Sequence, residues 1–433
     1  MSPARRPPLD LRLGVFFLWL LVLVMPLVFA PVARESFRQP KLLAAEWLAL
    51  ASLAGLAWGL SRVERVGLAD LWRPAAVRIV LPMLAVATLG LAFTPHPFHV
   101  REALIDLWIG AAALVGWSVA LPVSRLERLL RGLLWPAFLL ALIGIAQYHG
   151  LWQPLRFATL KAGSRLAITS LAGNPGDLAE FLVLPCLVAQ DLLRRRAGWS
   201  PGSWGVALAL AASVYAVLLT QTLAAVAALL AGSLLLWGVR MPRRRIALLF
   251  AGGAVIMALL VAGVAPLRER VVFKWQEMTR GNWNSVLSGR FDGWRAAVWM
   301  FERHPLAGVG QGAYQAEFVP AKLALIDRGV VFFPGLTQGS AFANAHNEIL
   351  ETAADWGIPG LLALAWGLWV LLRALRRQDT GETGAPGEGM LAWAGTAALA
   401  VLSLVNFPFR VALVAYPALL FLGWVLRRAE ETA

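Results

Sequence analysis

Long apolar runs, separated by shorter polar connections, make up most of the chain. A helix needs about 20 mainly apolar residues to cross the hydrocarbon core of a bilayer, and windows of about that length predict about twelve membrane-spanning helices. They lie at residues 13–33, 41–60, 77–95, 101–122, 132–149, 170–192, 204–221, 223–239, 246–264, 355–372, 389–406 and 411–426. The runs are continuous and do not alternate with polar positions, which excludes a membrane β-barrel. We therefore expect an all-α polytopic membrane protein.

The connections between these spans alternate in charge. One set is rich in arginine: Arg62, Arg65 and Arg73; Arg125, Arg128 and Arg131; Arg194, Arg195 and Arg196; Arg240, Arg243, Arg244 and Arg245; Arg373, Arg376 and Arg377; Arg427 and Arg428. Positively charged loops stay on the cytoplasmic side, so both termini are expected there. The predicted organisation is then spans one to nine in 1–264, an outward-facing polar segment in 265–354, and the last three spans in 355–433.

Composition agrees with a membrane protein: 59% of the residues are hydrophobic, 15% are charged and the mean hydropathy is +0.66. The net charge of +14 could suggest a nucleic-acid partner, but the arginines lie in short loops where they set topology, so we expect none. The single cysteine, Cys186, lies in an apolar run, so no disulfide framework or cysteine metal site is expected. The histidines are scattered and no acidic cluster has the pattern of a divalent-metal site.

The outer segment nevertheless keeps many cations on the side that the topology disfavours. They are Arg268, Arg270, Lys274, Arg280, Arg290, Arg295, Arg303, Lys322 and Arg328. Such placement suggests an anionic ligand on the outer face. The alternative is the ordinary surface charge of a folded segment, because acidic residues accompany the cations.

Two motifs in this segment could carry chemistry. Ser288 is a candidate N-cap of an apolar-periodic helix that ends at His304, which would place Arg290 in the first turn. Free backbone N–H groups and the helix dipole favour an anion there, and a guanidinium adds bidentate recognition of phosphate. The alternative is a capped interfacial helix with an arginine that reaches toward water. The glycine-rich run 306–312 follows no strand and faces away from cytoplasmic nucleotides, so it predicts a turn or a close backbone approach.

In the second motif, Asn344 could cap the helix that enters the span at 355–372, with His346 in its first turn. The positive helix end favours a neutral imidazole, which can accept a proton from a hydroxyl group. A structural histidine at the interface is the alternative. Further upstream, Asn174 followed by Pro175 is typical of a helix start, whereas Asp177 and Glu180 at membrane depth are typical of a functional site.

At these residues the chain resembles the O-antigen ligase family, a group that also includes O-antigen polymerases and pilin-type oligosaccharyltransferases. The matching stretches are 288–294, 304–310, His346-Asn347-Glu348 with Gly357 and Gly360, and Arg165 with Asn174-Pro175. The resemblance implies a GT-C-like fold in the bacterial inner membrane and a catalytic segment on the periplasmic face. It implies inverting transfer of a glycan from undecaprenyl diphosphate to lipid A-core, without a cofactor or metal.

By the same resemblance, His346 and Arg290 are the candidate catalytic residues, and Arg290 and Arg165 bind the donor diphosphate. Asn174, Asn347 and Glu348 are candidate substrate-binding residues. The family often has an arginine just after a Thr-Gln-Ser/Thr turn, but here Leu223 follows Thr220-Gln221-Thr222, so Arg165, Arg295 and Arg410 are candidate substitutes. An O-antigen polymerase using the same donor is the alternative enzyme. A lipid or polysaccharide transporter is less favoured, because transporters place their charges near the midplane.

Overall fold

The computed structural model describes residues 9–33, 35–60, 73–152, 162–196, 200–238, 265–333, 342–380 and 389–432, with a few isolated positions between 198 and 263. The predicted span 246–264 and the arginine-rich stretches 61–72 and 239–245 lie almost entirely outside the described residues. Where the chain is described, it is helical and has no strand.

Every predicted span apart from 246–264 overlaps a helix, which confirms an all-helical polytopic membrane protein. The helices of the bundle are α1 (Leu9–Leu23), α2 (Arg38–Leu60), α3 (Ala75–Gly90), α4 (Pro97–Ala120), α5 (Val123–Gly132), α6 (Leu134–Tyr148), α7 (Pro175–Arg194), α8 (Pro201–Thr220), α9 (Leu223–Gly238), α15 (Glu348–Thr380), α16 (Met390–Val405) and α17 (Ala412–Glu431). Within the described residues, six helical stretches are long and apolar enough to cross a membrane: α2, α4, α5 with α6, α8, α15 and α17.

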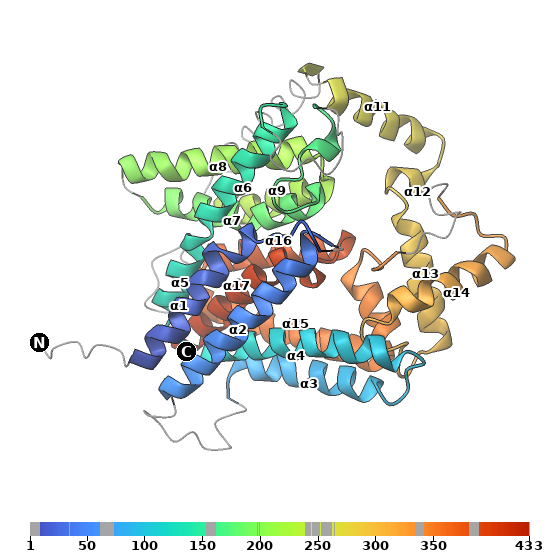
Figure 1. The fold of residues 1–433 in the computed structure, drawn as a ribbon, viewed down its shortest axis with the longest axis horizontal. Coiled ribbons are helices and arrows are strands. Elements are labelled where there is room, and N and C mark those ends of the chain that lie inside the picture. The colour runs from blue at the N-terminus through green and yellow to red at the C-terminus, as the bar shows by residue number, and fades with distance from the viewer. Residues whose placement is uncertain are drawn as a thin grey trace, which may run out of the picture.

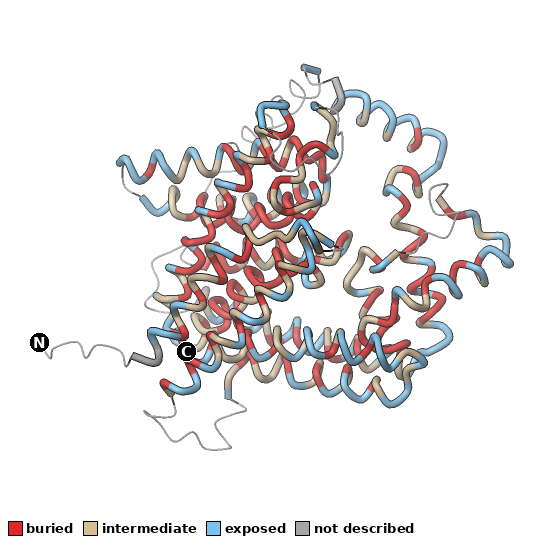
Figure 2. The backbone as a smooth tube through the Cα atoms, viewed as in Figure 1, coloured by how far each residue is buried: buried red, intermediate tan, exposed pale blue. Residues whose placement is uncertain are grey.

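The helices between 265 and 327 gather at one end of the apolar bundle (Figure 1, right). They are α11 (Ala265–Thr279), α12 (Trp283–Val286), α13 (Arg290–Arg303) and α14 (Tyr314–Asp327). In the middle of the bundle, α7 and α17 are buried on nearly all sides, as Figure 2 shows in red. A helix that is enclosed all round must be apolar all round. The acidic residues near the start of α7 are therefore exceptions that need a polar partner.

A second core joins the outer helices to α15. Ala297 and Met300 of α13, Tyr314 and Phe318 of α14, and Trp356 of α15 are buried together in it.

The glycine-rich run 306–312 approaches the backbone of α15, as the sequence predicts. Val309 N donates to Ala354 O at 2.9 Å. A Cβ on Gly308, which has φ +65°, would lie 2.3 Å from the backbone of Asp355, so only glycine fits there.

The structure corrects two predicted helix starts. α13 begins at Arg290 after Gly289 in the left-handed conformation, and Ser288 is not its N-cap. Helix α15 begins at Glu348, and its cap is Asn347, whose Oδ1 accepts from Leu350 N at 2.9 Å. His346 therefore precedes the helix instead of lying in its first turn. In both cases a residue within two positions after the predicted cap has a left-handed backbone, Gly289 with φ +82° and His346 with φ +57°. Capping preferences alone do not predict this conformation.

Candidate active site

The predicted motifs meet at residues 404–410, which comprise the last two residues of α16 and the segment after it that contains the short 3-10 helix η5 (Pro408–Arg410). Asn347 Nδ2 donates to Leu404 O at 2.9 Å. Arg290 Nε donates to Val405 O at 2.8 Å. Phe409 N donates to Glu348 Oε1 at 3.2 Å. Segments far apart in sequence are thus held against one short stretch of backbone, which we call the 404–410 connector.

Asn406 is the central residue of this connector. Its Nδ2 donates to Glu180 Oε1 at 2.5 Å, and its Oδ1 accepts from Arg290 Nη2 at 2.9 Å. An amide is the side chain that can donate to a carboxylate and accept from a guanidinium at the same time. Asn406 therefore links Glu180 to Arg290 and takes the place of a direct ion pair between them. It is 5% exposed, so water does not replace these bonds.

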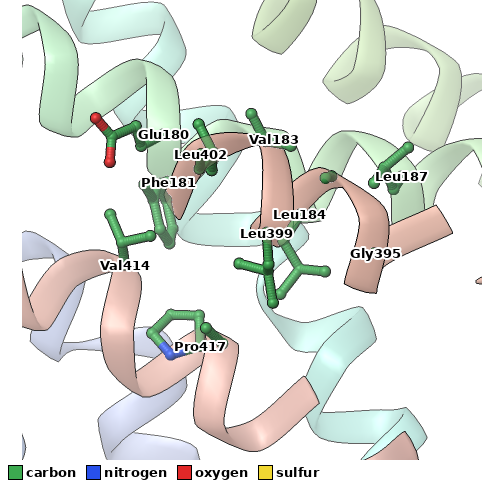
Figure 3. Close-up of a pocket in the computed structure, with 12 residues that line it drawn as sticks. Glu180, Phe181, Val183, Leu184, Leu187, Gly395, Leu399, Leu402, Val414 and Pro417 are labelled. Atoms are coloured by element: carbon green, nitrogen blue, oxygen red, sulfur yellow. The ribbon is translucent and has the colours of Figure 1, made fainter. Parts of the chain in front are cut away.

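Glu180 comes from the buried helix α7 (Figure 3). Its carboxylate points away from the apolar side chains of Leu184, Leu399 and Pro417, which line a pocket between α7, α16 and α17. This orientation leaves the apolar interior free of charge and turns the acid toward the connector. Asn406 and Glu180 thus belong to the site, although the sequence did not indicate a role for Asn406.

Arg290 makes all its hydrogen bonds to neutral acceptors. In addition to Val405 O and Asn406 Oδ1, Nη1 donates to Leu287 O at 3.2 Å. A guanidinium has five N–H donors, so about two remain free for a ligand. No carboxylate among the described residues forms an ion pair with Arg290. Burial and then nearby Arg270 lower the pKa of Arg290, while Glu180 raises it. The positive charge is therefore available to an anion.

Arg410 and Arg295, by contrast, have acidic partners. Arg410 Nη2 lies 3.0 Å from Asp355 Oδ2 and 3.4 Å from Glu351 Oε1. Burial alone would lower the pKa of Arg410, but the surrounding carboxylates raise it well above its usual value. Arg295 Nη1 lies 3.7 Å from Asp292 Oδ1. Neither arginine contacts the 220–222 turn in the structure, so their assignment as donor ligands stays a prediction that the geometry does not favour.

Arg165 does reach that turn. It lies in the 3-10 helix η3 (Arg165–Ala167), and its Nε donates to Thr220 O at 3.0 Å. Gln221 of the turn has φ +54°. Burial, followed by the positive charges of Arg270 and Arg290, lowers the pKa of Arg165 to about 10. Of the three substitutes that the sequence suggested, Arg165 is the one that the structure places beside the turn and Arg290.

His346 lies in the same region, with its ring between two aromatic rings. The ring centroids of Phe342 and Phe407 are 5.4 and 4.8 Å from that of His346. Its backbone has φ +57°, an uncommon conformation for a residue other than glycine. Nδ1 is buried without a hydrogen-bond partner among the described residues. Burial first, and then the charge of Arg290, lower the pKa of His346 to about 4. The imidazole is neutral near pH 7, as expected, but burial is the main cause.

The remaining candidates have structural partners. Asn174 Oδ1 accepts from Gly176 N at 2.7 Å and caps α7, as the sequence predicted. Asp177 accepts from Nε and Nη2 of Arg38, both at 2.8 Å. The guanidinium of Arg38 in turn lies 5.8 Å from the ring centroid of Phe407. Asn174, Asn347 and Glu348 thus help to build the site, and their direct contact with a substrate stays a prediction.

These features define a polytopic membrane protein in which a half-buried histidine and an arginine with no ion-pair partner among the described residues lie where the outer helices meet the bundle. Residues 208–365 match the family model described as O-antigen ligase, which confirms the resemblance over that part of the chain. The matched region contains the 220–222 turn, Arg290 and His346, whereas Asn406 lies outside it. No curated protein matches the chain.

Proposed function

We propose that the protein is an O-antigen ligase, an inverting, metal-independent glycosyltransferase of the GT-C type. It transfers a glycan from undecaprenyl diphosphate to a hydroxyl group of lipid A-core on the periplasmic face of the bacterial inner membrane. The observation that carries this proposal is the pairing of a cationic arginine, which has no carboxylate partner among the described residues, with a neutral histidine, both held by the 404–410 connector.

Arg290 binds the donor diphosphate in this mechanism. Two of its N–H groups are free, and a guanidinium recognises two phosphate oxygens at once. Arg165 contributes a second positive charge beside the 220–222 turn. As the glycosidic C–O bond breaks, the leaving diphosphate takes the electron pair, and charges already held in place stabilise it without reorganisation.

His346 acts as the general base. Its neutral imidazole accepts the proton of the acceptor hydroxyl group while the hydroxyl oxygen forms the new bond to the anomeric carbon. Attack opposite the leaving diphosphate inverts the anomeric configuration. The proton then leaves the imidazole for water or for the departing diphosphate, which regenerates the base. The alternative role for His346 is to position the diphosphate.

The test is transfer in vitro with purified protein, undecaprenyl-diphosphate-linked glycan and lipid A-core, in EDTA and without ATP. A ligase yields glycan-capped lipid A-core. An O-antigen polymerase, which shares the donor, yields longer lipid-linked glycan when lipid A-core is omitted. A transporter forms neither product, and that result would overturn the proposal.

A further inference from the structure

Helix α11 turns three of its charged side chains toward the protein and several of its apolar side chains outward. Arg270, Lys274 and Glu277 follow one another at helical spacing and are the partly or fully covered positions, together with Met278. The residues between them are exposed: Val271 at 47%, Val272 at 47%, Phe273 at 48% and Trp275 at 63%. If burial of apolar surface alone decided the orientation of α11, its apolar side chains would face the protein. The charged side chains that face inward therefore need polar or charged partners.

Both inward cations reach the elements that carry the proposed donor site. Arg270 Nη1 lies 3.5 Å from Gln221 Oε1 in the 220–222 turn. Lys274 Nζ donates to Ser285 O at 2.5 Å and to Ser288 Oγ at 3.0 Å, and Ser288 lies two residues before Arg290. Helix α11 thereby bridges the turn that holds Arg165 and the loop that leads into Arg290.

The result is a cluster of four cations: Arg165, Arg270, Lys274 and Arg290. Among the described residues none of the four forms an ion pair. Burial, followed by the charges of Arg270, Arg290 and Arg165, lowers the pKa of Lys274 to about 8. The acid near Lys274 is Glu277, which is already bound by Arg280 at 3.1 Å and Asn282 at 2.7 Å. Like charges held together with no direct ion pair among the described residues favour binding of an anion.

A second observation points to a ligand at the same turn. Thr222 is 5% exposed, and its Oγ1 has no hydrogen-bond partner among the described residues. A buried hydroxyl group without a partner is costly, and a bound polar group would satisfy it. The unpartnered hydroxyl and the unpaired cations thus lie at one place, on the turn that Arg165 and Arg270 both contact.

We propose that Arg270 and Lys274 of α11 complete, with Arg165 and Arg290, a four-cation site for the donor diphosphate. This inference rests on the proposed function and names residues of the same site. Four cations match the charge of two linked phosphoryl groups better than that of one, so we expect a monophosphate to use only part of the site. The apolar outer face of α11 is then left for the lipid surface beside the isoprenoid chain.

The test measures binding of undecaprenyl diphosphate and of undecaprenyl monophosphate to the full-length protein in nanodiscs of zwitterionic lipid. The double variant Arg270→Gln/Lys274→Gln is compared with the matched control Arg268→Gln, since Arg268 is an exposed cation of the same helix. Hydrogen bonds to charged groups predict that the double variant binds the diphosphate about tenfold or more weakly. The affinity of the double variant for the monophosphate, and the affinity of Arg268→Gln for the diphosphate, should each change about twofold at most. Single variants, each expected to lose about threefold, keep the test decisive if the double variant does not fold.

The outcomes separate this inference from the proposed function. If the folded variants bind the diphosphate as tightly as the wild type, and the wild type transfers glycan, the proposed role of α11 is overturned and the ligase proposal stands. Equal losses for monophosphate and diphosphate overturn the diphosphate assignment and indicate a general phosphate or headgroup site. If replacing Arg270 weakens diphosphate binding but the wild type forms no product, the proposed binding site stands and the proposed reaction fails.

Discussion

Replacing Arg290 by lysine keeps the positive charge and removes the forked arrangement of guanidinium N–H donors. The guanidinium reaches three acceptors that lie in different directions, at 2.8, 3.2 and 2.9 Å. A lysine ammonium is a single point with three donors on a flexible chain, and it cannot keep the contacts to Val405 and Asn406 while it binds two phosphate oxygens. Arg290→Lys therefore keeps the net charge and loses the geometry.

The size of the effect follows from the bonds that disappear. Loss of about two hydrogen bonds to the charged diphosphate, each worth about 1.5–3 kcal/mol, raises the barrier by about 3–6 kcal/mol. Since about 1.4 kcal/mol is a factor of ten, the transfer rate should fall by about 10²–10⁴-fold. Loss of the bonds to Val405 and Asn406, at about 0.5–1.5 kcal/mol each, costs about 1–3 kcal/mol of stability, so the variant should still fold.

The assay combines initial rates of transfer, donor affinity and thermal unfolding. The matched control is Arg303→Lys, at the other end of α13, where the exposed guanidinium lies 4.3 Å from the ring centroid of Trp299. The control should transfer glycan at nearly the wild-type rate. If Arg290→Lys retains a third or more of the wild-type rate while folded, the bidentate argument is refuted and Arg290 supplies charge alone.

Other residues of the site give distinct outcomes. Arg410→Ala leaves buried carboxylates without their cation and should destabilise the fold by about 3–5 kcal/mol in thermal unfolding, whereas Arg410→Lys should cost much less. His346→Ala should lower kcat by about 10²–10⁴-fold. Because the pKa of His346 is lowered to about 4, the imidazole stays neutral as the pH falls from 7 toward 5. Wild-type kcat/KM should therefore drop only as the pH approaches 4. A drop in kcat/KM centred near neutrality that His346→Ala abolishes would contradict the argument that burial lowers this pKa. Asn406→Asp places a second carboxylate against a buried acid and beside the donor arginine, so donor affinity should fall about tenfold in a binding assay; unchanged affinity would remove Asn406 from the site. Val331→Cys, at a position that is 83% exposed, should react with an impermeant thiol reagent from the periplasmic side and Gly384→Cys should not, whereas reversed labelling would refute the topology.

Local pattern was enough to predict the helices and some of their ends. Continuous apolar runs located each described span, because backbone hydrogen bonds can be satisfied inside a bilayer only by regular structure. The start of α7 at Pro175 after Asn174, and the end of α13 before His304, depend on residues adjacent in sequence. Arg290 and His346 were also visible as candidates, because their motifs are short and continuous.

The electrostatic state of these candidates depended on the tertiary structure. Arg290 and Arg410 look equivalent in the sequence, yet one meets only neutral acceptors and the other lies among carboxylates. The partners that decide this are distant: Arg290 and Asn406 are 116 positions apart, and Asn406 and Glu180 are 226 apart. Coulomb energy depends on distance and burial in space, and neither follows from spacing along the chain. For the same reason, the inward orientation of Arg270 and Lys274 on α11 became visible only once the helix was packed against the 220–222 turn.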